Sequence, residues 1–68
     1  MKWKDANFES KEIAELCKKD FENAGIRTGE IFQADVGTFN RTRYFVPYMP
    51  IGERQCQQAD MIISSHLW

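Results

Sequence analysis

The stretch FNRTRYFVPYMP, residues 39–50, decides how the rest of this chain can be arranged. Its twelve positions hold four aromatic residues, two arginines, two prolines and a methionine. Two apolar sets alternate along it: Tyr44, Val46 and Tyr48, and Phe45, Pro47 and Met49. This alternation predicts a β-strand from about Arg41 to Met49, because successive side chains of a strand point to opposite faces. Since both faces are apolar, one face needs a core, and the other needs an additional layer, a second copy of the chain or a binding surface.

A second alternating segment comes before this strand and completes a β-hairpin. Its apolar members on one face are Phe32, Ala34 and Val36. The residues from Gly37 to Asn40 interrupt the pattern, and Asn40 tolerates the left-handed backbone that a three-residue hairpin loop requires. The register that follows places Gly37 opposite Arg41, Asp35 opposite Arg43, Phe32 opposite Val46 and Ala34 opposite Tyr44. We also expect the second strand to lie at a sheet edge, because Pro47 cannot donate a backbone hydrogen bond.

Residues 10–25 carry the signals of a helix. Ser10 suits the position before the first turn. Gly25 suits the left-handed residue after the last turn, where Ile26 folds back onto Phe21. The expected inward face has helical spacing and consists of Ile13, Leu16, Cys17, Phe21 and Ala24. Charged residues occupy the other face.

The chain returns to helical spacing from Glu53 to Leu67. The apolar stripe of this segment is Cys56, Ala59, Ile62, Ile63 and Leu67. A third strand over 61–68 is the alternative, since β-branched residues favour strands. Near the start, Lys2-Trp3-Lys4 is a candidate short strand beside the hairpin. The predicted fold class is therefore α+β: a small single domain over residues 1–68, in the order (β)-α-β-β-α, with an antiparallel β-hairpin packed against two helices.

Length and composition limit the fold and the class of partner. A chain of 68 residues allows one domain, and a domain of this size buries only about 60% of the surface that its unfolded form exposes. The nine Lys and Arg residues and ten Asp and Glu residues leave a charge of −1, which disfavours nucleic-acid binding over the whole surface. The sequence has no apolar run of membrane-spanning length, and its start, MKWKDANF, lacks the apolar region of a signal peptide. We therefore expect a cytoplasmic protein.

Residues suited to catalysis or metal binding are few and scattered. Cys17 and Cys56 fall on the expected inward helix faces and are interpreted as core residues, with a disulfide between them or a reactive thiol as alternatives. His66 would lie about 15 Å of helix rise from Cys56, which is too far to act as its base. Short metal-ligand spacings and glycine-rich phosphate loops do not occur. We expect no enzyme activity, no metal and no cofactor.

The hairpin is the segment best suited to contact a partner. Its expected contact residues are Phe39, Arg41, Arg43, Phe45 and Met49. Aromatic residues and arginine are enriched at protein interfaces and supply most of their hot spots. The favoured hypothesis is a small non-enzymatic protein-binding module, an inhibitor or adaptor of the kind that phages and mobile elements encode. It would act on a protein partner or form a homodimer, with the acidic face of the first helix as a second candidate surface.

Two other functions use overlapping residues. The basic residues Arg27, Arg41, Arg43 and Lys2 or Lys4 would contact the phosphates of RNA or single-stranded DNA while the aromatic rings stack on bases. This alternative predicts binding that weakens steeply as salt rises. A small ribonuclease-like toxin that uses His66 as its general base is the weaker alternative.

Overall fold

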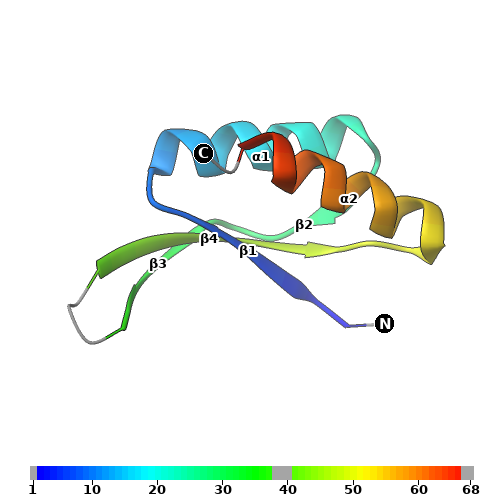
Figure 1. The fold of residues 1–68 in the computed structure, drawn as a ribbon. Coiled ribbons are helices and arrows are strands. Elements are labelled where there is room, and N and C mark those ends of the chain that lie inside the picture. The colour runs from blue at the N-terminus through cyan, green and yellow to red at the C-terminus, as the bar shows by residue number, and fades with distance from the viewer. Residues whose placement is uncertain (1, 38–40, 67–68) are drawn as a thin grey trace.

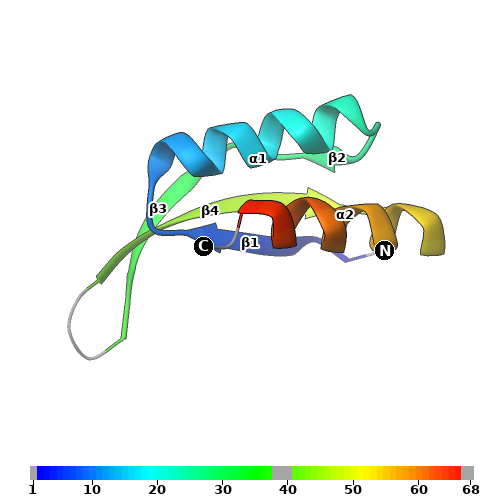
Figure 2. The same cartoon turned by 45° about the horizontal axis from the view of Figure 1, so that its top comes forward.

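The computed structural model describes residues 2–37 and 41–66 of the chain. Its strands are β1 (Lys4–Phe8), β2 (Arg27–Thr28), β3 (Phe32–Val36) and β4 (Arg41–Met49), and its helices are α1 (Lys11–Asn23) and α2 (Gly52–His66). The strands form one antiparallel sheet, and the two helices lie side by side on the same face of it (Figure 1, Figure 2). This arrangement confirms the α+β class. It also confirms a helix rather than a strand up to His66, whereas Leu67 and Trp68 lie outside the described residues.

The prediction that Pro47 marks an edge strand is wrong, because β4 is the central strand. All five residues of β1 pair with one edge of β4, and β2 and β3 pair in succession with the other edge. Between β2 and β3, the N–H of Gly29 donates a hydrogen bond of 2.9 Å to the Pro47 carbonyl. The nitrogen and the carbonyl of one strand residue point to the same edge of the strand. The Pro47 nitrogen therefore faces the break between β2 and β3, where the ladder of hydrogen bonds is already interrupted. The proline is thereby accommodated inside the sheet.

The hairpin register differs by one residue from the predicted one. Ala34 lies opposite Arg43, and Phe32 lies opposite Phe45. A slip of one residue moves every side chain of a strand to the other face, so Phe32 points away from the helices. Ile31 packs against the core in its place. Farther along, the hairpin extends past the start of α1, so no helix lies above it there to favour the predicted register (Figure 1).

The helix α1 ends as its sequence predicts. Gly25 has a φ of 79°, and its N–H donates to the Glu22 carbonyl at 3.0 Å. The N–H of Ile26 donates to the Phe21 carbonyl at 2.9 Å. These two bonds form a Schellman motif, which satisfies two carbonyls that the helix end would otherwise leave free.

Gly25→Ala is expected to lower the free energy of unfolding by about 1–2 kcal/mol, because a Cβ makes the left-handed conformation unfavourable. No atom lies within 4 Å of where that Cβ would be, so the loss reflects backbone strain and not a clash. Urea unfolding followed by circular dichroism measures it. Gly25→Asn is the matched variant and should lose less, since asparagine tolerates this conformation. Equal losses in the two variants would contradict the backbone explanation.

The core lies between the helix layer and the sheet. Its buried residues are Ala6, Phe8, Ala14, Cys17, Phe21, Ile26, Val46, Tyr48 and Ala59. The rings of Phe21 and Tyr48 are stacked with centroids 4.7 Å apart, which joins α1 to the central strand. One predicted inward residue is wrong: Leu16 is 55% exposed, and Ala14 is fully buried instead.

Two side-chain contacts join the ends of the helices. Gln55 Nε2 donates to the Gly25 carbonyl at 3.3 Å, where α2 begins and α1 has ended. At the other end of α2, His66 Nε2 lies 2.8 Å from Asp20 Oδ2. Within the part of the chain that the structure describes, neither helix combines the length and the apolar character needed to cross a bilayer.

Candidate functional site

The face of the sheet opposite the helices has no covering layer among the described elements (Figure 1, Figure 2). Val46 and Tyr48 of β4 are buried beneath the helices, so the alternate residues of this strand point to the other face. We call this face the open face. Its larger apolar residues, the apolar strip, are Trp3, Phe32, Phe45, Pro47 and Met49.

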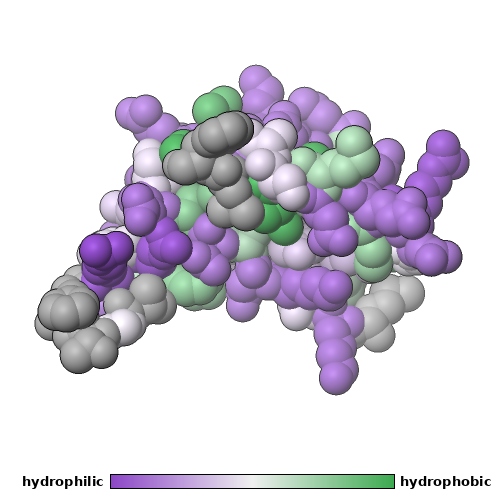
Figure 3. Space-filling view, viewed as in Figure 1, coloured by the Kyte–Doolittle hydropathy of each residue, from purple (hydrophilic) through white to green (hydrophobic). Residues whose placement is uncertain are grey.

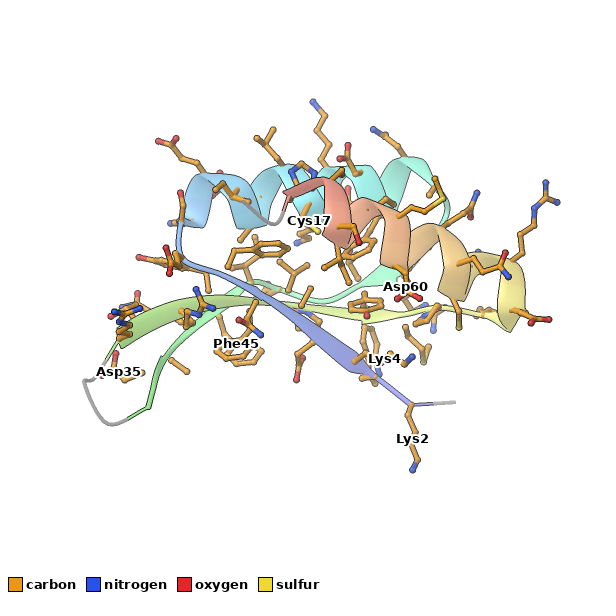
Figure 4. The ribbon with its side chains drawn as sticks, in the orientation of Figure 1. Lys2, Lys4, Cys17, Asp35, Phe45 and Asp60 are labelled. Atoms are coloured by element: carbon orange, nitrogen blue, oxygen red, sulfur yellow. The ribbon has the colours of Figure 1, made fainter. Side chains whose placement is uncertain are left out.

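The centre of the apolar strip is a stacked pair of phenylalanine rings. Phe32 and Phe45 lie directly opposite each other on β3 and β4, with ring centroids 5.1 Å apart and planes 9° apart. Figure 4 shows Phe45 on the side of the sheet away from the helices. Phe32 is 45% exposed. A large apolar side chain held in water on an ordered strand is the kind of group that a partner would bury with a gain in free energy.

Beyond this pair, the apolar strip continues to Pro47 and Trp3, whose side chains lie beside Gly29. A Cβ at this position would lie 3.3 Å from Cβ of Pro47 and 4.0 Å from Cζ3 of Trp3, so the glycine leaves room for both side chains. The ring of Trp3 lies near Pro47, beside Gly29. It nevertheless remains 51% exposed, which leaves a second aromatic group available on the open face.

Charged groups border the apolar strip. Arg43 Nη1 lies 3.3 Å from Glu9 Oε1, which replaces the predicted contact of Arg43 with Asp35. Asp35 instead accepts a hydrogen bond of 3.1 Å from the Thr42 hydroxyl. A shallow hollow at this point is lined by Glu9, Arg41, Thr42 and Arg43. Figure 3 shows hydrophilic surface at this end of the hairpin beside paler, apolar surface beneath the sheet.

Most of the predicted contact residues share the open face. Arg41, Arg43, Phe45 and Met49 occupy alternate positions of β4 and point the same way. Phe39 lies outside the described residues. The structure adds Trp3 and Phe32, and the predicted register had placed Phe32 opposite Val46 on the other face. Arg27, opposite Met49, brings a third arginine to this face.

The groups suited to chemistry lie on the helix side of the sheet. His66 packs edge-on against the ring of Phe8, 6.5 Å between centroids, and contacts Asp20. The arginines of β2 and β4 point to the opposite face, so the sheet separates them from the base that a ribonuclease-like site would use. No group of three or more metal-ligating side chains occurs among the described residues.

The two cysteines are free, so the alternative of a disulfide between them is not realised. Cys17 is fully buried, and burial raises the pKa of its thiol to about 12, with the negative charge of Asp20 adding to the effect. The nucleophilic form of a cysteine is the thiolate. Cys17 therefore stays protonated at neutral pH, as the interpretation of a core residue requires.

Comparison with known proteins provides no relative from which a function could be transferred. No protein-family model matches this chain, and no curated protein or solved structure matches it either. A function for the chain must therefore come from the geometry of the open face.

Proposed function

We propose that this protein is a small binding module whose open face contacts another protein chain. The observation that carries the proposal is the exposed Phe32–Phe45 stack on a sheet face that no described element covers. An antiparallel sheet with one face in water ordinarily carries polar side chains on that face. Here the face combines an apolar strip with arginines at its border, which is the composition of interface hot spots.

A protein partner fits this face better than a nucleic acid does. The stacked rings of Phe32 and Phe45 each hide one face against the other, and base stacking needs open ring faces. Arg43 is held by Glu9, and the whole chain carries a charge of −1. These features reduce phosphate binding, whereas neither weakens an apolar protein contact.

Photocrosslinking from position 32 tests the proposal. A photoreactive phenylalanine analogue at Phe32 of the full chain is expected to give a covalent product with a protein when cells that express it are irradiated. Leu16 is the matched control, because it is also a large apolar residue, 55% exposed, and belongs to α1 on the other layer. The same analogue at position 16 should give little or no product.

Two results would contradict the proposal. Equal products from positions 32 and 16 would mean that the open face has no preference for a partner. A product from position 32 that nuclease removes and protease does not would identify nucleic acid as the partner.

A further inference from the structure

We infer that the occupant of the open face is a second copy of this chain, held face to face in a two-fold homodimer. The inference rests on the proposed function, since it identifies the partner of the same surface. The size of the core, the apolar strip and the distribution of charge across the open face support it.

The core is small, and a partner that covers the open face would add to the stability that it provides. Its largest fully buried side chains are Phe21, Val46 and Cys17. Chains below about 70–80 residues usually add disulfides, a structural metal or an oligomeric contact to such a core. Both cysteines are free, and the described residues form no metal-ligating cluster. Of these three, an oligomeric contact is the one that the open face can supply, and a second copy is the partner that is present whenever the chain itself is made.

Each of the strands β1 and β2 places one charged residue on the open face, and the two charges have opposite signs. Asp5 of β1 lies opposite Pro47, and Arg27 of β2 lies opposite Met49. The acidic and the basic residue therefore lie on opposite sides of β4, near the same end of it. A two-fold axis that runs along β4, inclined to it by about 15°, places the β1 edge of each copy over the β2 edge of the other, and the two copies of β4 then cross at about 30°. Asp5 then faces Arg27 of the partner subunit, and the symmetry makes this contact twice.

The same axis is compatible with the rest of the face. Trp3 follows the β1 edge and comes near Arg27 of the partner subunit, where a cation–π contact adds to the ion pair. Phe45 and Pro47 lie near the axis and meet their own copies, which buries the centre of the apolar strip. Two packed sheets cross at about −30°, so the hairpin ends diverge and the arginines there are kept apart from their copies.

Sedimentation equilibrium of the full chain, from about 5 µM to 1 mM, tests the dimer. We expect a mass that rises with concentration toward twice the 8.0 kDa of one chain. Phe32→Ser should raise the dissociation constant about tenfold or more, because each copy loses a large apolar side chain that the partner subunit covers. Leu16→Ser, which removes a similarly exposed apolar side chain from the helix layer, should leave it unchanged.

A charge exchange tests the orientation of the two copies. Asp5→Arg and Arg27→Asp should each weaken the dimer about tenfold, since each places like charges across the interface. The double variant restores opposite charges and should return the dissociation constant to within about threefold of the original. A ¹⁵N–¹H spectrum of each variant verifies that the chain is folded.

Three results would overturn the dimer: a monomer at 1 mM, equal weakening by Leu16→Ser and Phe32→Ser, or a double charge variant that is no better than the single ones. These results are distinguishable from failure of the proposed function. A monomer whose position 32 still crosslinks to a different protein disproves the dimer and keeps the binding module. A monomer with no protein crosslink from position 32 disproves both.

Discussion

Phe21→Ala is expected to lower the free energy of unfolding by about 3–5 kcal/mol, which is the usual cost of removing a buried phenylalanine. Phe21 is fully buried, stacks on Tyr48 and joins α1 to the central strand. The loss includes the transfer of the ring to water and the cavity that it leaves. A domain of this size has only about 3–5 kcal/mol of stability from its core, so a large fraction of the variant should be unfolded at 25 °C.

Urea unfolding followed by circular dichroism measures this change. Phe32→Ala is the matched control, because it removes the same side chain from a position that is 45% exposed. It should cost less than about 1.5 kcal/mol at concentrations where the chain is monomeric. Comparable losses in the two variants would contradict the assignment of Phe21 to the core and Phe32 to the open face.

A loss of stability in alkali is the second large effect expected. The pKa of the Cys17 thiol is raised from 9.0 to about 12 in the folded protein by burial. Above pH 9 the unfolded chain loses this proton while the folded chain keeps it, so the unfolded state binds fewer protons. The free energy of unfolding must then fall as pH rises from about 9 to 12, by at most about 1.4 kcal/mol per pH unit for this group. The stabilisation is fully present below pH 9.

Urea unfolding at several pH values between about 8 and 10.5 checks this slope. Cys17→Ala should be less stable at pH 8 because of its smaller side chain, yet its stability should fall less steeply in alkali. Burial also raises the pKa of Tyr48, and this contribution has the same sign and stays in both proteins. An unchanged slope in Cys17→Ala would show that the thiol does not set the alkaline limit.

The elements of this fold could be predicted wherever local signals agree. The alternation from Arg41 to Met49 matches the observed strand, and Ser10 and Gly25 flank the observed helix. In these segments the backbone preference, the apolar period and the end signals point to one structure. The signals near Ile62 and Ile63 disagree, because β-branched residues favour a strand while the spacing favours a helix.

The position of a strand in the sheet could not be predicted from the strand itself. Pro47 indicated an edge, but the neighbours of β4 are set by β1 at the start of the chain and by the interruption at Gly29. The register was wrong for a related reason. Ile31 and Phe32 are both apolar, so either could face the core, and the packing of Ile31 decides between them.

This one-residue difference is also what changes the candidate site. Arg41, Arg43, Phe45 and Met49 could be assigned to one face from their alternation alone. Phe32 could not be assigned to the same face, because its orientation depends on the register. The sequence did contain a signal for the observed register. Shifting the predicted pairing by one residue places Phe32 opposite Phe45, and aromatic pairs across strands are favourable.

The central place of β4 has a consequence for how the chain is made. Each of the other strands pairs with β4 and, among the described strands, with no other. Lys4 can pair only after Tyr48 has been synthesised, which is more than forty residues later. The first helix can begin to form from its own signals, but no strand has a partner until the ribosome has passed residue 41. Sheet formation is therefore a late event on the growing chain, because β1 and β4 can pair only after most of these 68 residues have been synthesised.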